Sequence, residues 1–230
     1  MDAYTPTPRS RIKRLPKRAH YDRQTVHAVL DAAFIAHVGY VIDGQPYVTP
    51  TSFWREGEAL YWHGSSASRM LRAQSVGLKV CLTVTHVDGL VMARSGFHHS
   101  INYRSVLAFG TAHKLEDGAA KLKALEAFVE RVAPGRWAEI RPPNAQELKA
   151  TTVMAMTIED AVAKVRTGPP VDDEPDYALP VWAGVVPLTT VAGQAIADPR
   201  LKPATPLPDY LKAFTTADAV DDLLANYAAD

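Results

Sequence analysis

The chain has little cysteine: Cys81 is the only one among 230 residues. A single thiol excludes an intramolecular disulfide framework and the multi-cysteine sites that hold zinc or an iron–sulfur cluster. The chain also lacks any run near the ~20 apolar residues that a membrane helix needs, and its first residues show no apolar signal core. These absences predict a cytoplasmic protein that does not enter a membrane.

The formal net charge is zero as well, because 25 Lys and Arg residues balance 25 Asp and Glu residues. No overall field therefore favours nucleic acid or an anionic membrane. Basic residues do gather between Arg9 and Arg23, where Asp22 is the only acidic residue. Such an arm could contact phosphates, but it carries no aromatic stacking platform. We expect it to pack over the domain or a partner subunit, with nucleic-acid binding as the alternative.

No glycine-rich dinucleotide fingerprint, P-loop or serine-elbow motif occurs, which disfavours the common nucleotide and hydrolase folds. Short apolar runs bounded by turn residues dominate instead and predict many antiparallel strands. The predicted strands cover residues 34–42, 47–54, 59–63, 78–87, 90–97, 106–115, 153–158 and 161–165. Hairpin turns are expected at Asp43-Gly44, Glu56-Gly57 and Asp88-Gly89. A closed barrel or a sandwich follows, because closure removes exposed strand edges.

Helices are expected around this sheet. Val26, Val29, Leu30 and Ala33 recur at helical spacing before the first strand, and residues 122–132 form a second helix that stops before a proline. Asn144 and Glu147 suggest a capping pair, and a terminal helix lies near the end. The expected organisation is a basic arm over residues 1–19, one mainly β domain over 20–188, and a C-terminal extension with a terminal helix over 189–230.

The junction between the third strand and the next helix is a candidate phosphate site. Unpaired backbone N–H groups at a helix start suit an anion, and hydroxyls and a guanidinium add donors there. The alternative is a plain helix cap with a solvated arginine. The junction consists of His63, Gly64, Ser65, Ser66, Ser68 and Arg69.

A second candidate lies in the polar and aromatic interval over residues 97–105. Asn102 and Ser105 could read ring atoms of a ligand, Tyr103 could stack, and Arg104 could hold an anion, although a satisfied surface loop is the alternative. The neighbouring His98 and His99 would point to opposite faces of a strand and cannot chelate one ion, so no metal site is predicted.

Two further residues could belong to a functional site but could equally have a packing role. Cys81 lies within an apolar strand, where a packing role is expected instead of a nucleophilic one. Trp182 follows a proline-rich connector and either packs in the core or covers a flat cofactor.

Nine segments occur in the order typical of one family. Together they resemble the flavin-nucleotide-binding branch of the pyridoxamine 5'-phosphate oxidase-like proteins, which is related to the nitroimidazole reductases. The resemblance runs from about Arg14 to about Leu188. The segments are residues 18–22, 38–41, 50–53, 63–65, 68–71, 94–100, 102–106, 163–170 and 180–184.

The resemblance implies a six-stranded antiparallel FMN-binding split barrel that forms a homodimer, with one FMN in each of two interfacial clefts. The flavin ring would lie against Thr49, Pro50, Thr51 and Ser52, with the phosphate near Ser66, Ser68 and Arg69. The partner subunit would contribute from Asn102, Tyr103, Arg104 and Ser105, or from Trp182. Lys164 and Arg166 are further anion contacts by resemblance, with solvated cations as the alternative.

The expected function is that of an FMN-dependent oxidoreductase acting on a small molecule that the sequence does not identify. His63 or His98 could assist proton transfer, although packing beside the flavin is the expected role. The set of basic residues and tyrosine that binds the substrate phosphate in true pyridoxamine phosphate oxidases is not found, so that substrate is not expected. The alternatives are a non-catalytic flavin store or sensor, and a barrel that binds haem or a deazaflavin in place of FMN.

Overall fold

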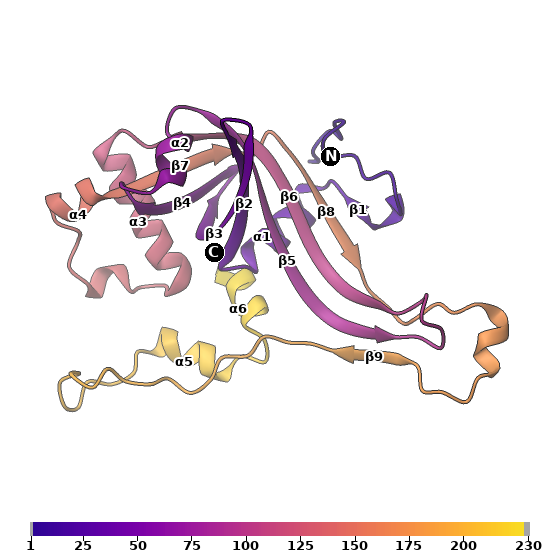
Figure 1. Cartoon of the computed structure of the whole chain (residues 1–230). Coiled ribbons are helices and arrows are strands. Elements are labelled where there is room, and N and C mark those ends of the chain that lie inside the picture. Colours follow the sequence, from indigo (N-terminus) through magenta and orange to yellow (C-terminus); the bar gives the residue numbers. More distant parts are fainter. Residues whose placement is uncertain (1, 228–230) are drawn as a thin grey trace.

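Six antiparallel strands close into a ring in the computed structural model, which describes residues 2–227 (Figure 1). The ring runs β6-β7-β4-β3-β2-β5, and a direct pairing of β5 with β6 closes it. This confirms the predicted six-stranded antiparallel split barrel. The strands are β2 (Ile35–Ile42), β3 (Gln45–Glu56), β4 (Ala59–Ser65), β5 (Leu78–Met92), β6 (Ser100–Lys114) and β7 (Thr151–Thr157).

The barrel is split because its two 15-residue strands, β5 and β6, each serve two neighbours along one edge. That edge of β6 pairs with β8 (Asp160–Arg166) over residues 103–109 and with β7 over residues 112–114. The corresponding edge of β5 pairs with β2 over residues 81–83 and with β9 (Gly184–Pro187) over residues 89–92. Beyond the ring, β5, β6, β8 and β9 continue as a protruding arm (Figure 1). A short strand, β1 (Ala19–His20), pairs with β8.

The core lies inside the ring and follows the two-residue period of the strands. On β2, Ala36, Val38 and Tyr40 are buried while the residues between them are more exposed. Trp62 on β4 is fully buried, and its Nε1 donates to Oε1 of Gln74 at 3.0 Å. Two helices contribute apolar side chains to this core: α1 (Arg23–Asp31) and α2 (Arg69–Gln74).

A second apolar cluster lies on the outside of the ring. There α3 (Gly118–Val132) covers Trp54 and Val153, which come from β3 and β7. The chain then forms η2 (Trp137–Glu139) and α4 (Ala145–Ala150). Asn144 and Glu147 form the predicted capping box at the start of α4. The helix predicted over residues 122–132 is likewise confirmed, with Asp117 as its N-cap.

Both ends of the chain pack on the barrel. In the N-terminal arm, which includes η1 (Pro16–Arg18), Tyr4 is buried and Arg9 lies 3.0 Å from Glu159. At the other end, η3 (Glu174–Ala178), α5 (Asp209–Thr216) and α6 (Val220–Tyr227) follow, so a pair of helices replaces the single one expected. Leu224 of α6 is fully buried. Within residues 2–227, no helix is long and apolar enough to cross a membrane.

One predicted hairpin is wrong. Asp88-Gly89 does not reverse the chain, because β5 runs through it with an irregularity in register between Val87 and Gly89. A Cβ on Gly89 would lie 3.1 Å from the backbone oxygen of Val186, so this glycine allows β9 to approach closely. The chain reverses at residues 93–99 instead. Residues 100–105, predicted as part of a polar connection, therefore belong to strand β6.

Candidate functional site

Arg69 at the start of α2 lies against strand β3. Its guanidinium is 4.5 Å from the centre of the Tyr47 ring, which stacks on Tyr40 at 5.6 Å. The Tyr40 hydroxyl lies 3.0 Å from Oγ1 of Thr49. Because residues directly opposite on paired strands share a face, Tyr47, Thr49 and Thr51 lie on the face of Tyr40. The fold therefore brings Arg69 to the predicted ring-binding strand through Tyr47, which sequence reasoning missed.

The hydroxyls beside Arg69 are available for a ligand. Ser68 is the N-cap of α2 but makes no side-chain cap bond, and Ser65 Oγ accepts only from the Ala67 amide at 3.2 Å. Ser66 is exposed and uses its backbone amide to bond Ala150 O at 2.8 Å. Among the ion pairs within residues 2–227, none involves Arg69. Donors for an anion thus gather at this corner of the barrel.

His63 faces the opposite side of the sheet. Successive residues of a strand alternate, so Trp62 and Gly64 face the core while His63 points outward. Its ring lies 4.7 Å from the Phe128 ring and 5.8 Å from the ring of Trp54. The Nδ1 atom is buried without a hydrogen-bond partner, and burial lowers the pKa of the imidazole. His63 is therefore neutral at neutral pH and is separated from the Arg69 corner by the sheet.

A cavity of about 450 Å³ opens in front of this histidine. Its walls come from α3, η2, the start of α4 and the first residue of β7, and they are mostly apolar. Charge occurs only as an ion pair in which Arg141 lies 2.6 Å from Glu147 and holds the pKa of that carboxyl at about 2. The lining residues are His63, Leu125, Phe128, Val129, Trp137, Ile140, Arg141, Pro143, Glu147 and Thr151.

The polar residues predicted on the second candidate stretch lie on the arm and bond one another. Asn102 is buried, accepts a hydrogen bond from Arg166, and donates to the Gly168 carbonyl at 3.1 Å. Ser105 Oγ donates to the Lys164 carbonyl at 3.3 Å. The arrangement is that of two strands tied together by side chains, because these donors and acceptors are already used.

Arg104 is also occupied. Its guanidinium lies 2.8 Å from Asp88 and 3.1 Å from Asp221 of α6, while His86 lies 2.9 Å from the same Asp221. Hydrogen bonds from Arg104 to Asp88 raise the pKa of the guanidinium. This cluster fastens the C-terminal helix to the arm.

The other predicted residues on the arm are more open. His98 lies 3.4 Å from Asp173, a distance that does not form a good hydrogen bond, and Tyr103 is half-buried. Trp182 is 68% exposed. In Figure 1 the arm extends away from the end of the barrel that carries α2, so one chain does not bring these residues to Arg69.

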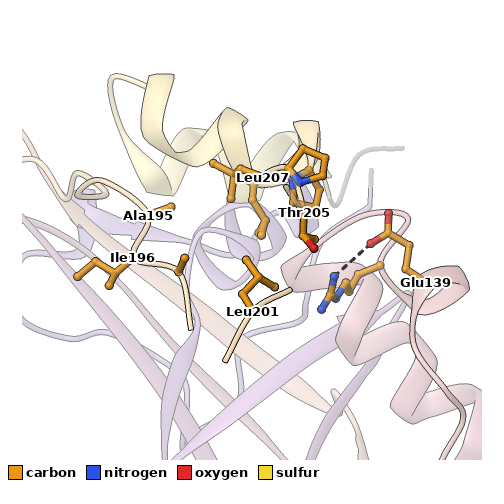
Figure 2. Close-up of a pocket in the computed structure, with 11 residues that line it drawn as sticks. Glu139, Ala195, Ile196, Leu201, Thr205 and Leu207 are labelled. Atoms are coloured by element: carbon orange, nitrogen blue, oxygen red, sulfur yellow. Dashed lines mark hydrogen bonds and ion pairs between the residues drawn. The ribbon is translucent and has the colours of Figure 1, made fainter. Parts of the chain in front are cut away.

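A cavity of about 590 Å³ lies beneath the C-terminal extension (Figure 2). It is lined mainly by apolar residues of that extension, such as Ala195 and Leu207, and its charged pair, Arg136 and Glu139, is closed on itself at 3.1 Å. None of the predicted site residues reaches it. Within the described part of the chain, no three His, Cys, Asp or Glu side chains gather as ligands for a free metal ion.

The closed six-stranded ring with its split long strands defines the flavin-binding split-barrel class. A family model described as pyridoxamine 5'-phosphate oxidase matches residues 22–165, and the chain belongs to this family. A search of curated proteins found no match.

Two solved structures are similar over nearly the whole chain. The flavocytochrome Anf3 from Azotobacter vinelandii is 46% identical, with 92% of this chain and 98% of that chain covered and a TM-score of 0.87. The FAD and haem binding protein from Mycobacterium smegmatis is 38% identical, with 86% and 97% covered and a TM-score of 0.83. A candidate 5-nitroimidazole antibiotic resistance protein from Bacteroides thetaiotaomicron is 21% identical over 64% of this chain and 86% of that chain, with a TM-score of 0.51, and shows the fold alone.

Proposed function

We propose that this protein is an oxidoreductase that binds both a flavin and haem and moves electrons between them. The observation that carries the proposal is its similarity, over at least 86% of the chain, to a flavocytochrome and to an FAD and haem binding protein. When bound, a flavin exchanges electrons in pairs or singly, and haem iron exchanges one at a time. The chain's own part is to bind and orient the two groups and to exclude water.

The flavin is FAD in this proposal, whereas the sequence favoured FMN. The relative described as binding FAD supports the larger flavin. Both flavins carry a phosphate next to the ribityl chain, so the same corner of the barrel serves either one. Arg69, Ser66 and Ser68 would bind that phosphate, and Thr49 to Ser52 of β3 would lie along the ring. The unpaired guanidinium beside β3 supports this placement.

We also propose a homodimer in which the second copy completes the flavin cleft. The outer face of β2 and β3 carries apolar side chains that the chain itself leaves uncovered: Ile35, Val41 and Val48 are 47%, 50% and 67% exposed. Exposed apolar side chains gathered on one face of a sheet are typical of an interaction site. A second copy seated there would lie beside Pro50 and Ser52, which share that face.

Protein purified from cells supplied with haem precursor should carry flavin and haem in comparable molar amounts. Absorption bands near those of oxidised flavin and a Soret band would report the two groups, and chromatography of the extracted flavin distinguishes FAD from FMN. A protein without flavin would contradict the proposal that this chain binds a flavin. A protein with flavin but without haem would contradict the proposal that it binds both groups.

Val48→Lys is expected to shift the protein from dimer to monomer and to weaken flavin retention, because a charged side chain would be desolvated at the interface. Light scattering should give about twice the chain mass of 25.1 kDa for the wild type and the single mass for the variant. Val191→Lys is the control, since Val191 is 66% exposed on the C-terminal extension. A wild-type monomer that holds a full complement of flavin would overturn the dimer.

A further inference from the structure

The cavity in front of His63 has the size and lining of a cofactor site. Its volume of about 450 Å³ falls within the range usual for ligand pockets, roughly 300 to 1,000 Å³. Six apolar side chains form most of the wall: Leu125, Phe128, Val129, Trp137, Ile140 and Pro143. A flat, largely apolar ligand would bury its surface against such walls.

His63 lies at the wall of this cavity and is held by packing alone. The Phe128 ring stands edge-on to it and the Trp54 ring is tilted against it, at 4.7 Å and 5.8 Å. Within residues 2–227 no hydrogen bond joins its ring to another group, and its buried Nδ1 is unpartnered. Nε2, the other ring nitrogen, is not buried in this way and makes no hydrogen bond within the described part of the chain, so it is the atom through which the imidazole would meet a ligand in the cavity.

Of the other half-buried histidines, His27 and His86 are already engaged, while His20 and His98 line neither this cavity nor the one under the C-terminal extension. Nε2 of His27 lies 3.0 Å from the Tyr4 hydroxyl. His86 uses both nitrogens, with Nε2 at 3.1 Å from the Val29 carbonyl and Nδ1 at 2.9 Å from Asp221. The cavity that His86 lines is polar and includes Arg104 and Asp88. Of these histidines, His63 alone combines an unengaged ring with apolar walls.

The mouth of the His63 cavity carries a cation suited to a carboxylate. Arg141 has a 69% exposed side chain and holds the carboxylate of Glu147 in a bidentate pair at 2.6 Å and 2.8 Å, so a second carboxylate would bind there by displacing Glu147. A propionate of haem presents the same chemical group. Apolar walls, one imidazole and one rim guanidinium fit haem, whereas a free metal ion would need several ligands together.

We infer that haem occupies the cavity between β4 and the α3–η2–α4 segment, with the imidazole of His63 as an iron ligand and Arg141 facing a propionate. This inference rests on the proposed function, because it requires that the protein binds haem. It places the haem beside α3 on the outer face of β4 and the flavin phosphate at the Arg69 corner, where Tyr47 lies on the inner face of β3. Only the short β4–α2 junction, residues 63 to 69, separates the two sites in the sequence.

The test compares purified full-length His63→Ala and His63→Met with the wild type, using haem content, the visible spectrum and flavin content. His63→Ala should lose haem at least about tenfold after gel filtration, the scale on which changes at a metal site commonly weaken binding. Added imidazole should restore a ligated Soret spectrum to this variant. His63→Met should retain haem with a changed spectrum and a higher reduction potential, because thioether ligation raises it.

Flavin content shows whether each variant is folded, since Arg69 and β3 are untouched. His86→Gln is the control histidine and should keep the wild-type haem spectrum. Wild-type haem content and spectra in both His63 variants would overturn the inference while leaving the proposed function intact. A wild-type protein that binds flavin but no haem would overturn the proposed function itself.

Discussion

Arg69→Ala is expected to weaken flavin binding by about 10- to 100-fold. The guanidinium is the cation that lies against β3 at the predicted phosphate corner, and hydrogen bonds to a charged group contribute about 1.5–3 kcal/mol. Each 1.4 kcal/mol corresponds to about tenfold in affinity. Titration of apoprotein with FAD, followed by quenching of flavin fluorescence, measures the change. Arg69→Lys should recover part of the loss, because it keeps the charge but not the planar fork.

Arg72→Ala is the matched control for this experiment. Arg72 belongs to the same short helix and is exposed, but it does not stack on Tyr47. Its removal lowers the net charge by the same amount and should leave the affinity close to that of the wild type. Equal losses for the two variants would mean that Arg69 acts only through general charge, and would remove the phosphate contact from the proposal.

Gly110→Ala is expected to destabilise the apoprotein by about 3 kcal/mol, at the upper end of what overpacking usually costs. Gly110 lies where β6 leaves β8 and joins β7, after the Phe109–Asp160 pair and before the Ala112–Met156 pair. A Cβ there would meet the backbone oxygen of Thr157 and would lie 2.6 Å from Cγ of Met156. The carbonyl is held in place because the next two amides, of Ile158 and Glu159, donate to the Glu58 and Phe109 carbonyls at 2.8 Å and 3.0 Å. Urea unfolding measures the loss.

Gly118→Ala provides the contrast. Gly118 is the first residue of α3, and a Cβ there would meet no atom within 4 Å. Alanine lowers the entropy of the unfolded chain and favours helix, so a gain of up to about 1 kcal/mol is expected. If Gly110→Ala unfolded at the same urea concentration as the wild type, the prediction would be wrong: the contact between β6 and the β7–β8 connection would not require glycine at position 110.

Local patterns predicted much of the barrel. The alternation on β2 and the Asp43-Gly44 turn, in which both residues have positive φ, were readable because each depends on neighbours in the sequence. The same holds for the capping box at Asn144 and Glu147. Turn chemistry and helix caps need only a few consecutive residues, so they appear in the sequence before any tertiary contact forms.

The Asp88-Gly89 hairpin failed for a tertiary reason. The Asp-Gly dipeptide is typical of a tight turn. Here, however, β9 packs beside Gly89, and it can approach closely because Gly89 has no Cβ. β9 comes almost a hundred residues later in the chain, so no local pattern reveals it. The longer β5 and β6 then moved Asn102 to Ser105 from a connection onto a strand.

The candidate site divided in the same way. Five residues lie between His63 and Arg69, and sequence reasoning treated the whole segment as one phosphate-binding junction. The alternation of β4 turns His63 outward to α3, while α2 carries Arg69 to β3. The two-residue alternation of β4 was enough to predict that His63 faces outward. The cavity could not be predicted, because most of its walls come from residues 125 to 151.

By itself the sequence determined the family, the antiparallel strands and the polar groups that are candidates for a flavin site, because these follow from local periodicity and ordered motifs. Only the tertiary structure decided which of those groups are already occupied and which face an apolar cavity. Arg104 and Asn102 carry suitable side chains, yet partners distant in the sequence use them, whereas His63 is left with an unpaired ring nitrogen. The reason is that ring closure and helix packing select the partners of each side chain, and those contacts join segments that no local pattern links.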